Sequence, residues 1–218
     1  MSSITHVIFD LDGVLLDTEP LYTESAQRIC SRYGQSYNWD IKRQSMGRDA
    51  RLGARITIET LGLPIGVDEY LEQREKNLAE LFLGAPEMPG AVQLIDDLVG
   101  RGLILAIATS SQRELCSKKF HGKAWLDRIS SITYGDDPEL QQLKPEPDIF
   151  LLAARRVGAR PENCLVFEDS VAGVEAALRA NMRVVAMPDP HIRDNEVFER
   201  ATQCIGAFSE LDLTKFGV

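Results

Sequence analysis

Residues 6–18 of this chain read HVIFDLDGVLLDT, and the prediction of the fold starts from this stretch. Residues 7–9 are β-branched or aromatic and carry no charge, which is typical of a strand buried on both faces of a parallel sheet. Asp10 and Asp12 follow at the carboxyl end of that strand, which faces the ligand crevice in an open α/β sheet. The stretch therefore predicts an α/β fold with two carboxylates at one sheet edge.

Two carboxylates in so small a space repel each other, and a cation or a proton allows them to coexist. A plainer interpretation is an Asx turn in which Gly13 adopts a positive φ. The residues further along the chain favour the first interpretation.

The composition limits the class of protein and its partners. A chain of 218 residues with 44% hydrophobic content fits one substantial α/β domain, alone or with a smaller insertion. The net charge of -9 argues against nucleic acid or an anionic membrane surface as a main partner, although a local basic site can still hold a small anion. The four cysteines have no paired spacing, and the N-terminal residues lack a basic and then apolar signal segment. We therefore expect a cytoplasmic protein.

Helical periodicity replaces the strand pattern from residue 19 to about residue 86. Three apolar helical faces follow one another, made by Ala26, Ile29, Cys30 and Tyr33, then by Leu52, Ile56 and Leu61, then by Val67, Leu71, Leu78, Leu81 and Phe82. No strand pattern interrupts them, so we expect a helical insertion. The alternative is that these helices belong to a single core.

Further apolar runs predict strands at residues 103–108, 129–134, 165–167 and 184–186. The first ends in Thr109, Ser110 and Ser111, whose hydroxyl and N–H groups at a strand-to-helix junction suit phosphoryl oxygens or a helix cap. The run at 165–167 ends in Glu168, Asp169 and Ser170, and Ser170 is positioned to cap a helix that ends at Asn181. Lys144 precedes a proline, so it should lie in an extended segment with its side chain free to reach inward.

Four motifs in this order resemble those of the haloacid-dehalogenase-like phosphatases, and the resemblance covers nearly the whole chain. They are Phe-Asp-x-Asp-Gly-x-Leu-x-Asp-Thr at residues 9–18, Thr109, Lys-Pro-x-Pro-Asp-Ile-Phe at residues 144–150, and Glu-Asp-Ser-x-x-Gly-x-x-Ala-Ala at residues 168–177. The resemblance implies a Rossmann-like parallel-sheet core formed by residues 1–17 and 87–218. It also implies a small all-helical cap at residues 18–86, inserted after the first strand, that closes over the active site.

The resemblance also implies the site. Asp10 is the nucleophile, Asp12 is the acid/base, and Thr109, Ser110 and Lys144 hold the phosphoryl group. Hard oxygen ligands without histidine or cysteine favour Mg²⁺, which takes one or two carboxylates together with waters and a phosphate. We expect its ligands to be Asp10, Asp169 and the backbone carbonyl of Asp12, with Glu168 binding directly or through water.

The expected activity is Mg²⁺-dependent hydrolysis of a small phosphorylated metabolite through an aspartyl-phosphate. Longer stretches are similar to the branch that contains pseudouridine-5'-phosphatases, which leaves pseudouridine 5'-phosphate and other nucleotide or sugar phosphates open as substrates. The cap should set specificity, with Tyr22, Arg48 and Arg51 as candidates. We expect a monomer or weak homodimer.

Two alternatives stay open. One is a β-phosphoglucomutase-like sugar-phosphate mutase, although such enzymes typically carry a histidine near the position of Tyr22. The other is a non-catalytic protein that binds a phosphorylated metabolite, although a pure binder has no need of Asp12.

Overall fold

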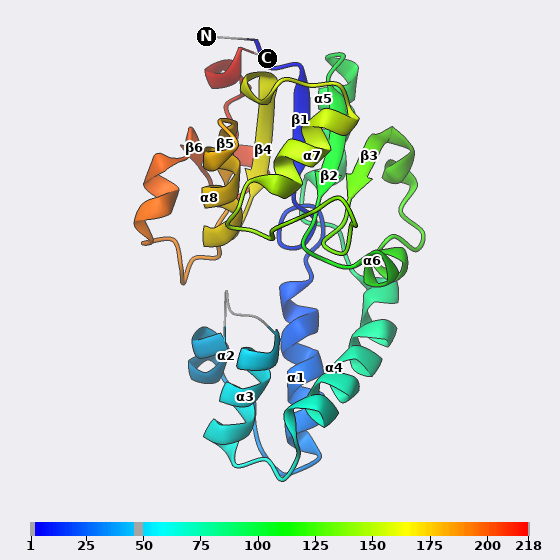
Figure 1. Cartoon of the computed structure of the whole chain (residues 1–218), viewed down its shortest axis with the longest axis vertical. Helices are drawn as coiled ribbons and strands as arrows, with labels where there is room; N and C mark the ends of the chain where they lie inside the picture. The colour runs from blue at the N-terminus through cyan, green and yellow to red at the C-terminus, as the bar shows by residue number, and fades with distance from the viewer. Residues whose placement is uncertain (1–2, 46–49, 218) are drawn as a thin grey trace. The chain divides into compact units, whose positions relative to one another are not determined.

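The computed structural model describes residues 3–45 and 50–217, and it divides the chain into two compact units (Figure 1). One unit comprises Met1–Asp17 and Pro86–Val218, and the other comprises Thr18–Ala85. The expected boundary at residues 86 and 87 lies one residue further along the chain. None of the helices in the described ranges has the length and apolar character needed to cross a membrane.

The first unit is built on a six-stranded sheet with the order β3-β2-β1-β4-β5-β6, in which every neighbouring pair is parallel. Its strands are β1 (His6–Phe9), β2 (Ile104–Ala108), β3 (Ile129–Thr133), β4 (Cys164–Glu168), β5 (Arg183–Ala186) and β6 (Gln203–Cys204). The predicted α/β class with a parallel sheet is confirmed. The strand β1 lies between β2 and β4, with Phe9 opposite Ile107 on one side and Phe167 on the other.

Four α-helices connect and cover these strands: α5 (Ala91–Gly100), α6 (Arg113–Lys119), α7 (Asp148–Arg156) and α8 (Val171–Arg179). Short 3-10 turns complete the unit: η2 (Ala124–Arg128), η3 (Pro161–Asn163), η4 (Glu196–Arg200), η5 (Phe208–Glu210) and η6 (Leu213–Phe216). The helices α7 and α8 pack on the sheet in one buried cluster, whose members include Ile8, Val166 and Val184 from the strands and Phe150, Ala153, Val174 and Ala177 from the helices. Because these apolar side chains leave water together, the cluster fixes α7 and α8 on the sheet.

The capping residues of α8 are those that the sequence predicts, although the helix itself ends at Arg179, two residues before Asn181. The Ser170 hydroxyl accepts a hydrogen bond from the Gly173 N–H at 3.0 Å, and Asn181 follows the helix with a φ of 58°. A serine cap and a left-handed residue satisfy backbone groups that a helix leaves unpaired at its ends. The cap matters for the site because it places the first turn of α8 beside the end of β4.

The second unit consists of α1 (Glu19–Ser31), α2 (Trp39–Ser45), α3 (Ala50–Leu61), α4 (Val67–Leu81) and the 3-10 turn η1 (Phe82–Gly84). Its described residues form helices and no strand, as the periodicity predicts. They pack around a small core that contains Ile29, Cys30, Ala54, Leu63 and Tyr70. The helix α2 was not predicted, because it buries only Ile41 and so leaves no apolar period in the sequence.

Candidate active site

The polar residues of the first unit gather where β1, β2 and β4 end. Asp10 directly follows β1, and its N–H donates to the Phe167 carbonyl at 2.9 Å, which continues the pairing of β1 with β4. Glu168 is the last residue of β4, and Thr109 directly follows β2. The parallel register therefore brings residues from three distant parts of the sequence to one edge.

Lys144 joins two of these strand ends. Its Nζ atom lies 2.5 Å from Asp10 Oδ1, 2.6 Å from Glu168 Oε1 and 3.3 Å from the Ala108 carbonyl oxygen. The Lys144 side chain is only 6% exposed. The lysine thus reaches inward from its loop, as the sequence predicts, and its ammonium is shielded from water. The expected extended segment is wrong, because residue 144 lies in a turn that the Glu146 N–H closes by donating to the Leu143 carbonyl at 3.0 Å.

The three groups do not balance in charge. Burial raises the pKa of Asp10 to about 7; Lys144 opposes this shift, and the nearby Glu168 and Asp12 carboxylates add to it. Burial disfavours the charge of Lys144, but the Asp10 and Glu168 carboxylates outweigh that cost and raise the Lys144 pKa above its ordinary value. Two buried carboxylates therefore share one ammonium, and the excess negative charge favours a bound cation or a proton on Asp10.

Glu168 is held from two sides. Its Oε1 accepts from Lys144, and its Oε2 accepts from the Ser170 N–H at 2.8 Å and from the Ser170 hydroxyl at 3.0 Å. Its side chain is 1% exposed. Both carboxylate oxygens thus have protein donors, so Glu168 anchors Lys144. Metal binding by Glu168, directly or through water, stays a prediction.

Oxygen donors suited to a hard cation lie around the turn at Gly13. Gly13 has a positive φ, 76°, as the plainer interpretation of this stretch required, and a Cβ atom there would lie 2.3 Å from Asp169 Oδ2. The Asp169 carboxylate therefore lies against the backbone that links Asp12 to the next residue. Among the described residues no three His, Cys, Asp or Glu side chains form a ready metal cage. Mg²⁺ does not need one, because it binds one or two carboxylates and keeps several waters.

The Asp12 side chain has partners that the sequence analysis missed. Lys119 Nζ lies 2.6 Å from Asp12 Oδ1 and 2.7 Å from Oδ2, and the Ser111 hydroxyl donates to Oδ2 at 2.8 Å. Lys119 is the last residue of α6 and follows another lysine, so in the sequence it looks like an ordinary solvated helix end. No signal in the sequence distinguishes it from Lys118.

The two hydroxyl residues expected to bind phosphate differ in exposure. Thr109 is buried, and its Oγ1 accepts from the Ser111 N–H at 3.1 Å, an arrangement in which the Thr109 O–H can donate to an anion. Ser110 is exposed. Its backbone lies so close to Gly135 that a Cβ atom on Gly135 would be 2.1 Å from the Ser110 carbonyl oxygen. The loop after β2 is thus held in place by its backbone as well as by its side chains.

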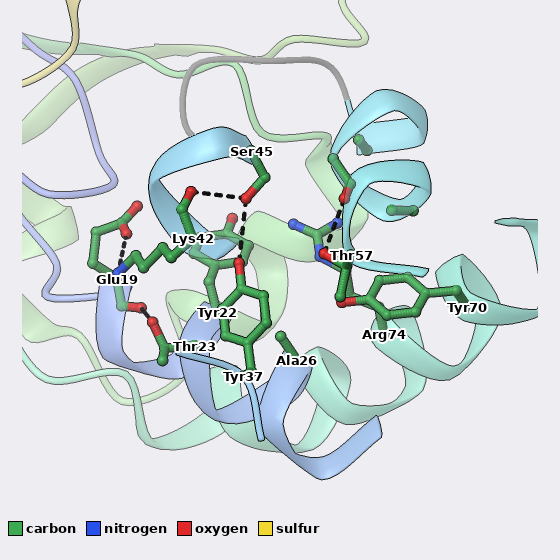
Figure 2. A pocket seen from close by; sticks show the side chains of 13 residues that line it. Glu19, Tyr22, Thr23, Ala26, Tyr37, Lys42, Ser45, Thr57, Tyr70 and Arg74 are labelled. Atoms are coloured by element: carbon green, nitrogen blue, oxygen red, sulfur yellow. Dashed lines mark hydrogen bonds and ion pairs between the residues drawn. The ribbon is translucent and has the colours of Figure 1, made fainter. Parts of the chain in front are cut away.

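The second unit contains a cavity of about 240 Å³ (Figure 2). Thirteen residues line it: Glu19, Tyr22, Thr23, Ala26, Tyr37, Lys42, Ser45, Ala50, Gly53, Ala54, Thr57, Tyr70 and Arg74. Of the predicted specificity residues, Tyr22 lines the cavity and Arg48 lies outside the described residues. Arg51 is not among the lining residues, and its exposed guanidinium pairs with Asp68 at 2.6 Å.

Charged and hydroxyl groups surround this cavity, as Figure 2 shows. Lys42 pairs with Glu19 at 2.9 Å, and the Tyr37 and Ser45 hydroxyls lie 3.2 Å apart. The Arg74 guanidinium stacks over the Tyr22 ring at 5.2 Å. Lys42 and Arg74 were not predicted, because on the sequence they belong to the charged faces of their helices. The lining suits a small ligand rich in hydrogen-bonding groups.

Comparison with known proteins extends the likeness beyond single motifs. A family model described as haloacid dehalogenase-like hydrolase matches residues 4–181. The chain is 38% identical to a probable pseudouridine-5'-phosphatase of Drosophila melanogaster, covering 100% of this chain and 96% of that protein. It is 42% identical to (DL)-glycerol-3-phosphatase 2 of Arabidopsis thaliana, covering 87% and 82% respectively. A putative beta-phosphoglucomutase structure from Thermotoga maritima has a TM-score of 0.79 at 30% identity, covering 93% and 94%.

Proposed function

Because this chain belongs to the haloacid dehalogenase-like hydrolases and is a phosphatase, we propose that it hydrolyses a small phosphorylated metabolite through an aspartyl-phosphate on Asp10. The observation that carries the proposal is the Lys144 ammonium, which contacts Asp10 at 2.5 Å and Glu168 at 2.6 Å. A phosphate monoester and a carboxylate nucleophile are both anionic, so a buried positive charge beside the nucleophile lowers the repulsion that attack must overcome.

The proposed first step is in-line attack of an Asp10 carboxylate oxygen on phosphorus. The new bond joins Asp10 to the phosphoryl group, and the bond from phosphorus to the substrate oxygen breaks. Thr109 and Lys144 donate hydrogen bonds to the phosphoryl oxygens. Ser110, the residue after Thr109, also binds the phosphoryl group. A water molecule then attacks phosphorus, releases phosphate and restores the Asp10 carboxylate.

Asp12 handles the proton in both steps. It donates a proton to the departing substrate oxygen, and it then takes a proton from the attacking water. Asp12 lies two residues after the nucleophile and directly before Gly13, whose φ is 76°. Catalytic turnover needs a residue that gives and takes this proton, whereas a protein that only binds a phosphorylated ligand does not.

The oxygen donors around Gly13 fit Mg²⁺, and we propose that Asp10, Asp169 and the Asp12 carbonyl hold it. When bound, Mg²⁺ supplies positive charge that offsets the charge of the phosphoryl group. We assign Glu168 to the support of Lys144, since both of its oxygens accept protein hydrogen bonds.

We propose that the helical unit is the cap that selects the leaving group, with its cavity as the selecting site. Tyr22 and Arg74 are the residues we place there, because their stacked side chains combine an aromatic face with hydrogen-bond donors. Pseudouridine 5'-phosphate, glycerol phosphate and other sugar phosphates are the candidates. The proposed setting is the cytoplasm, which agrees with four free cysteine thiols, and the proposed assembly is a monomer or weak homodimer.

The test is phosphate release from a panel of monoesters, with Mg²⁺ and with EDTA. The panel contains pseudouridine 5'-phosphate, uridine 5'-phosphate, glycerol phosphate and hexose phosphates. Mg²⁺-dependent release supports the proposal, and a strong preference for one nucleotide names the substrate. Isomerisation of a hexose phosphate without release favours a mutase, an outcome worth measuring because of the likeness to a putative beta-phosphoglucomutase.

A further inference from the structure

Lys119 is a lysine that solvent does not reach. Its side chain is 0% exposed, although it stands at the end of the short helix α6. Its ammonium lies 2.6 and 2.7 Å from the two Asp12 oxygens and donates to the Ser111 hydroxyl at 2.8 Å. The Ser111 hydroxyl donates in turn to Asp12 Oδ2 at 2.8 Å. Through these bonds Lys119 and Ser111 hold both oxygens of the Asp12 carboxylate.

Stability of the fold does not account for this lysine. Burying an ammonium costs desolvation energy, and replacing a buried ion pair by apolar side chains of similar volume is often neutral or stabilising. Asp12 is 22% exposed, so water can solvate its carboxylate if the ammonium is removed. A methionine at position 119 would fill nearly the same space without that cost. We therefore look for the reason that the Lys119 ammonium is buried in the chemistry of Asp12.

We propose that Lys119, with Ser111, is a positioning residue for Asp12: it fixes the carboxylate that exchanges a proton with the leaving group. This inference rests on the proposed role of Asp12 in phosphate transfer. A carboxylate bound through both oxygens has one orientation, whereas a partly exposed one samples several side-chain rotamers. Since proton transfer requires the acid within hydrogen-bond reach of the leaving oxygen, loss of this orientation slows that transfer.

The experiment compares Lys119→Met with Lys118→Met on two kinds of phosphomonoester. Lys118 is the matched control, since it is the preceding residue of α6 and its ion pair with Glu114 at 3.5 Å lies at the surface. The first substrate is the alkyl phosphate that the wild-type enzyme hydrolyses fastest, whose alkoxide must be protonated as it leaves. The second is 2,4-dinitrophenyl phosphate, whose leaving group departs as a stable anion without a proton.

Lys119→Met should lower kcat/KM for the alkyl phosphate by about 10- to 100-fold, the order that misplacement of a catalytic group costs. For 2,4-dinitrophenyl phosphate it should lower kcat/KM by less than about threefold, because general-acid catalysis does not contribute to that step. Lys118→Met should change neither value by more than about twofold, as expected for a surface ion pair. In an Asp12→Ala background, adding Lys119→Met should cost less than about twofold, because residues that act through one group are not additive.

An equal loss on both substrates, or the same loss in the Asp12→Ala background, would show that Lys119 serves the fold and would overturn the inference. If Lys119→Met does not fold, Ser111→Ala provides the same comparison, with a smaller loss confined to the alkyl phosphate. Failure of the wild-type enzyme to release phosphate from any monoester refutes the proposed function itself. An active wild-type enzyme with a uniform Lys119→Met loss refutes only the role of Lys119.

Discussion

A Cβ atom on Gly173 would lie 1.6 Å from Glu168 Oε1, so the first turn of α8 leaves room for that carboxylate only because residue 173 is glycine. The same oxygen accepts the hydrogen bond of Lys144 at 2.6 Å. The missing side chain of one helix residue thus controls where the lysine beside the nucleophile can lie.

We expect Gly173→Ala to lower both phosphatase activity and stability. The added methyl forces Glu168 to rotate or α8 to shift, and overpacking of this kind costs about 1–3 kcal/mol. Chemical denaturation and phosphate release measure the two effects. Gly100→Ala is the control, because nothing lies within 4 Å of its Cβ position in α5, and it should be neutral or stabilising by up to about 1 kcal/mol. Equal behaviour of the two variants would contradict the steric argument.

Asp10→Asn should abolish turnover without unfolding the protein. The side-chain amide of this variant is not a nucleophile, so attack on phosphorus stops. The amide is also uncharged, so it does not incur the desolvation cost that raises the pKa of the Asp10 carboxyl to about 7, and the protein should still fold. Rapid-quench experiments with ³²P-labelled substrate should trap a phosphoenzyme on the wild type and none on the variant, while circular dichroism remains unchanged. Asp97→Asn, at an exposed ion pair of α5, should behave as wild type. Ordinary activity in Asp10→Asn would refute the assignment of the nucleophile.

Removal of the metal should stop phosphate release, and Asp169→Asn should raise the Mg²⁺ concentration needed for half-maximal activity by about tenfold or more. The loss follows because Asp169 supplies an oxygen beside the Gly13 turn. Titration of EDTA-treated enzyme with Mg²⁺ measures it. Asp96→Asn, whose carboxylate pairs with Arg128 at the surface, is the control. An unchanged Mg²⁺ requirement in Asp169→Asn would remove that residue from the metal site.

The stability of the protein should depend on pH through Asp137, which lies in the segment that carries Lys144. The Asp137 carboxylate accepts two hydrogen bonds from Arg156 of α7, at 2.6 and 3.0 Å. The bonds from Arg156 hold the pKa of the buried Asp137 carboxyl below its ordinary value of 3.8. A lowered pKa in the folded state means that the stabilisation is complete above the ordinary pKa and is lost as the pH falls through the lower folded value.

Asp137→Asn should therefore be less stable than wild type at pH 6 by about 1–3 kcal/mol, the range for hydrogen bonds to charged groups. The difference should shrink towards pH 3 as the wild-type carboxyl is protonated. Urea denaturation at several pH values measures it. Glu114→Gln, at an exposed surface pair, should show no such trend. A difference that does not change with pH would exclude the ion pair as its cause.

Arg74→Met should raise KM for the preferred substrate by about tenfold, the effect of losing one hydrogen bond to a charged group. With acetyl phosphate, whose leaving group offers little to a cavity lined by hydroxyl groups, KM should change by less than about twofold. Arg32→Met is the control, since Arg32 lies at the surface and bonds Gln73 at 3.0 Å. An equal rise in KM for both substrates would argue against the cavity as the selecting site.

The strand ends explain why much of the site was predictable. Asp10 and Glu168 each follow or close an apolar run, and parallel strands present their carboxyl ends at one edge, so the pattern of runs already brings them together. The positive φ of Gly13 and the cap at Ser170 were predictable for a similar reason. Each depends on a few consecutive residues and on the local chemistry of the backbone.

The sequence by itself thus determined the parallel sheet, the helical insertion and the residues at the strand ends, because hydrophobic period and backbone propensity act over short stretches of chain. The tertiary structure decided which charges meet. It paired Lys119 with Asp12 across a separation of 107 residues, and it turned Glu168 towards Lys144. It also paired Arg51, a predicted specificity residue, with Asp68 at the surface. Arg74, which was not predicted, lines the cavity. Ion pairs between distant residues depend on burial and distance after packing, and no periodicity in the sequence encodes either.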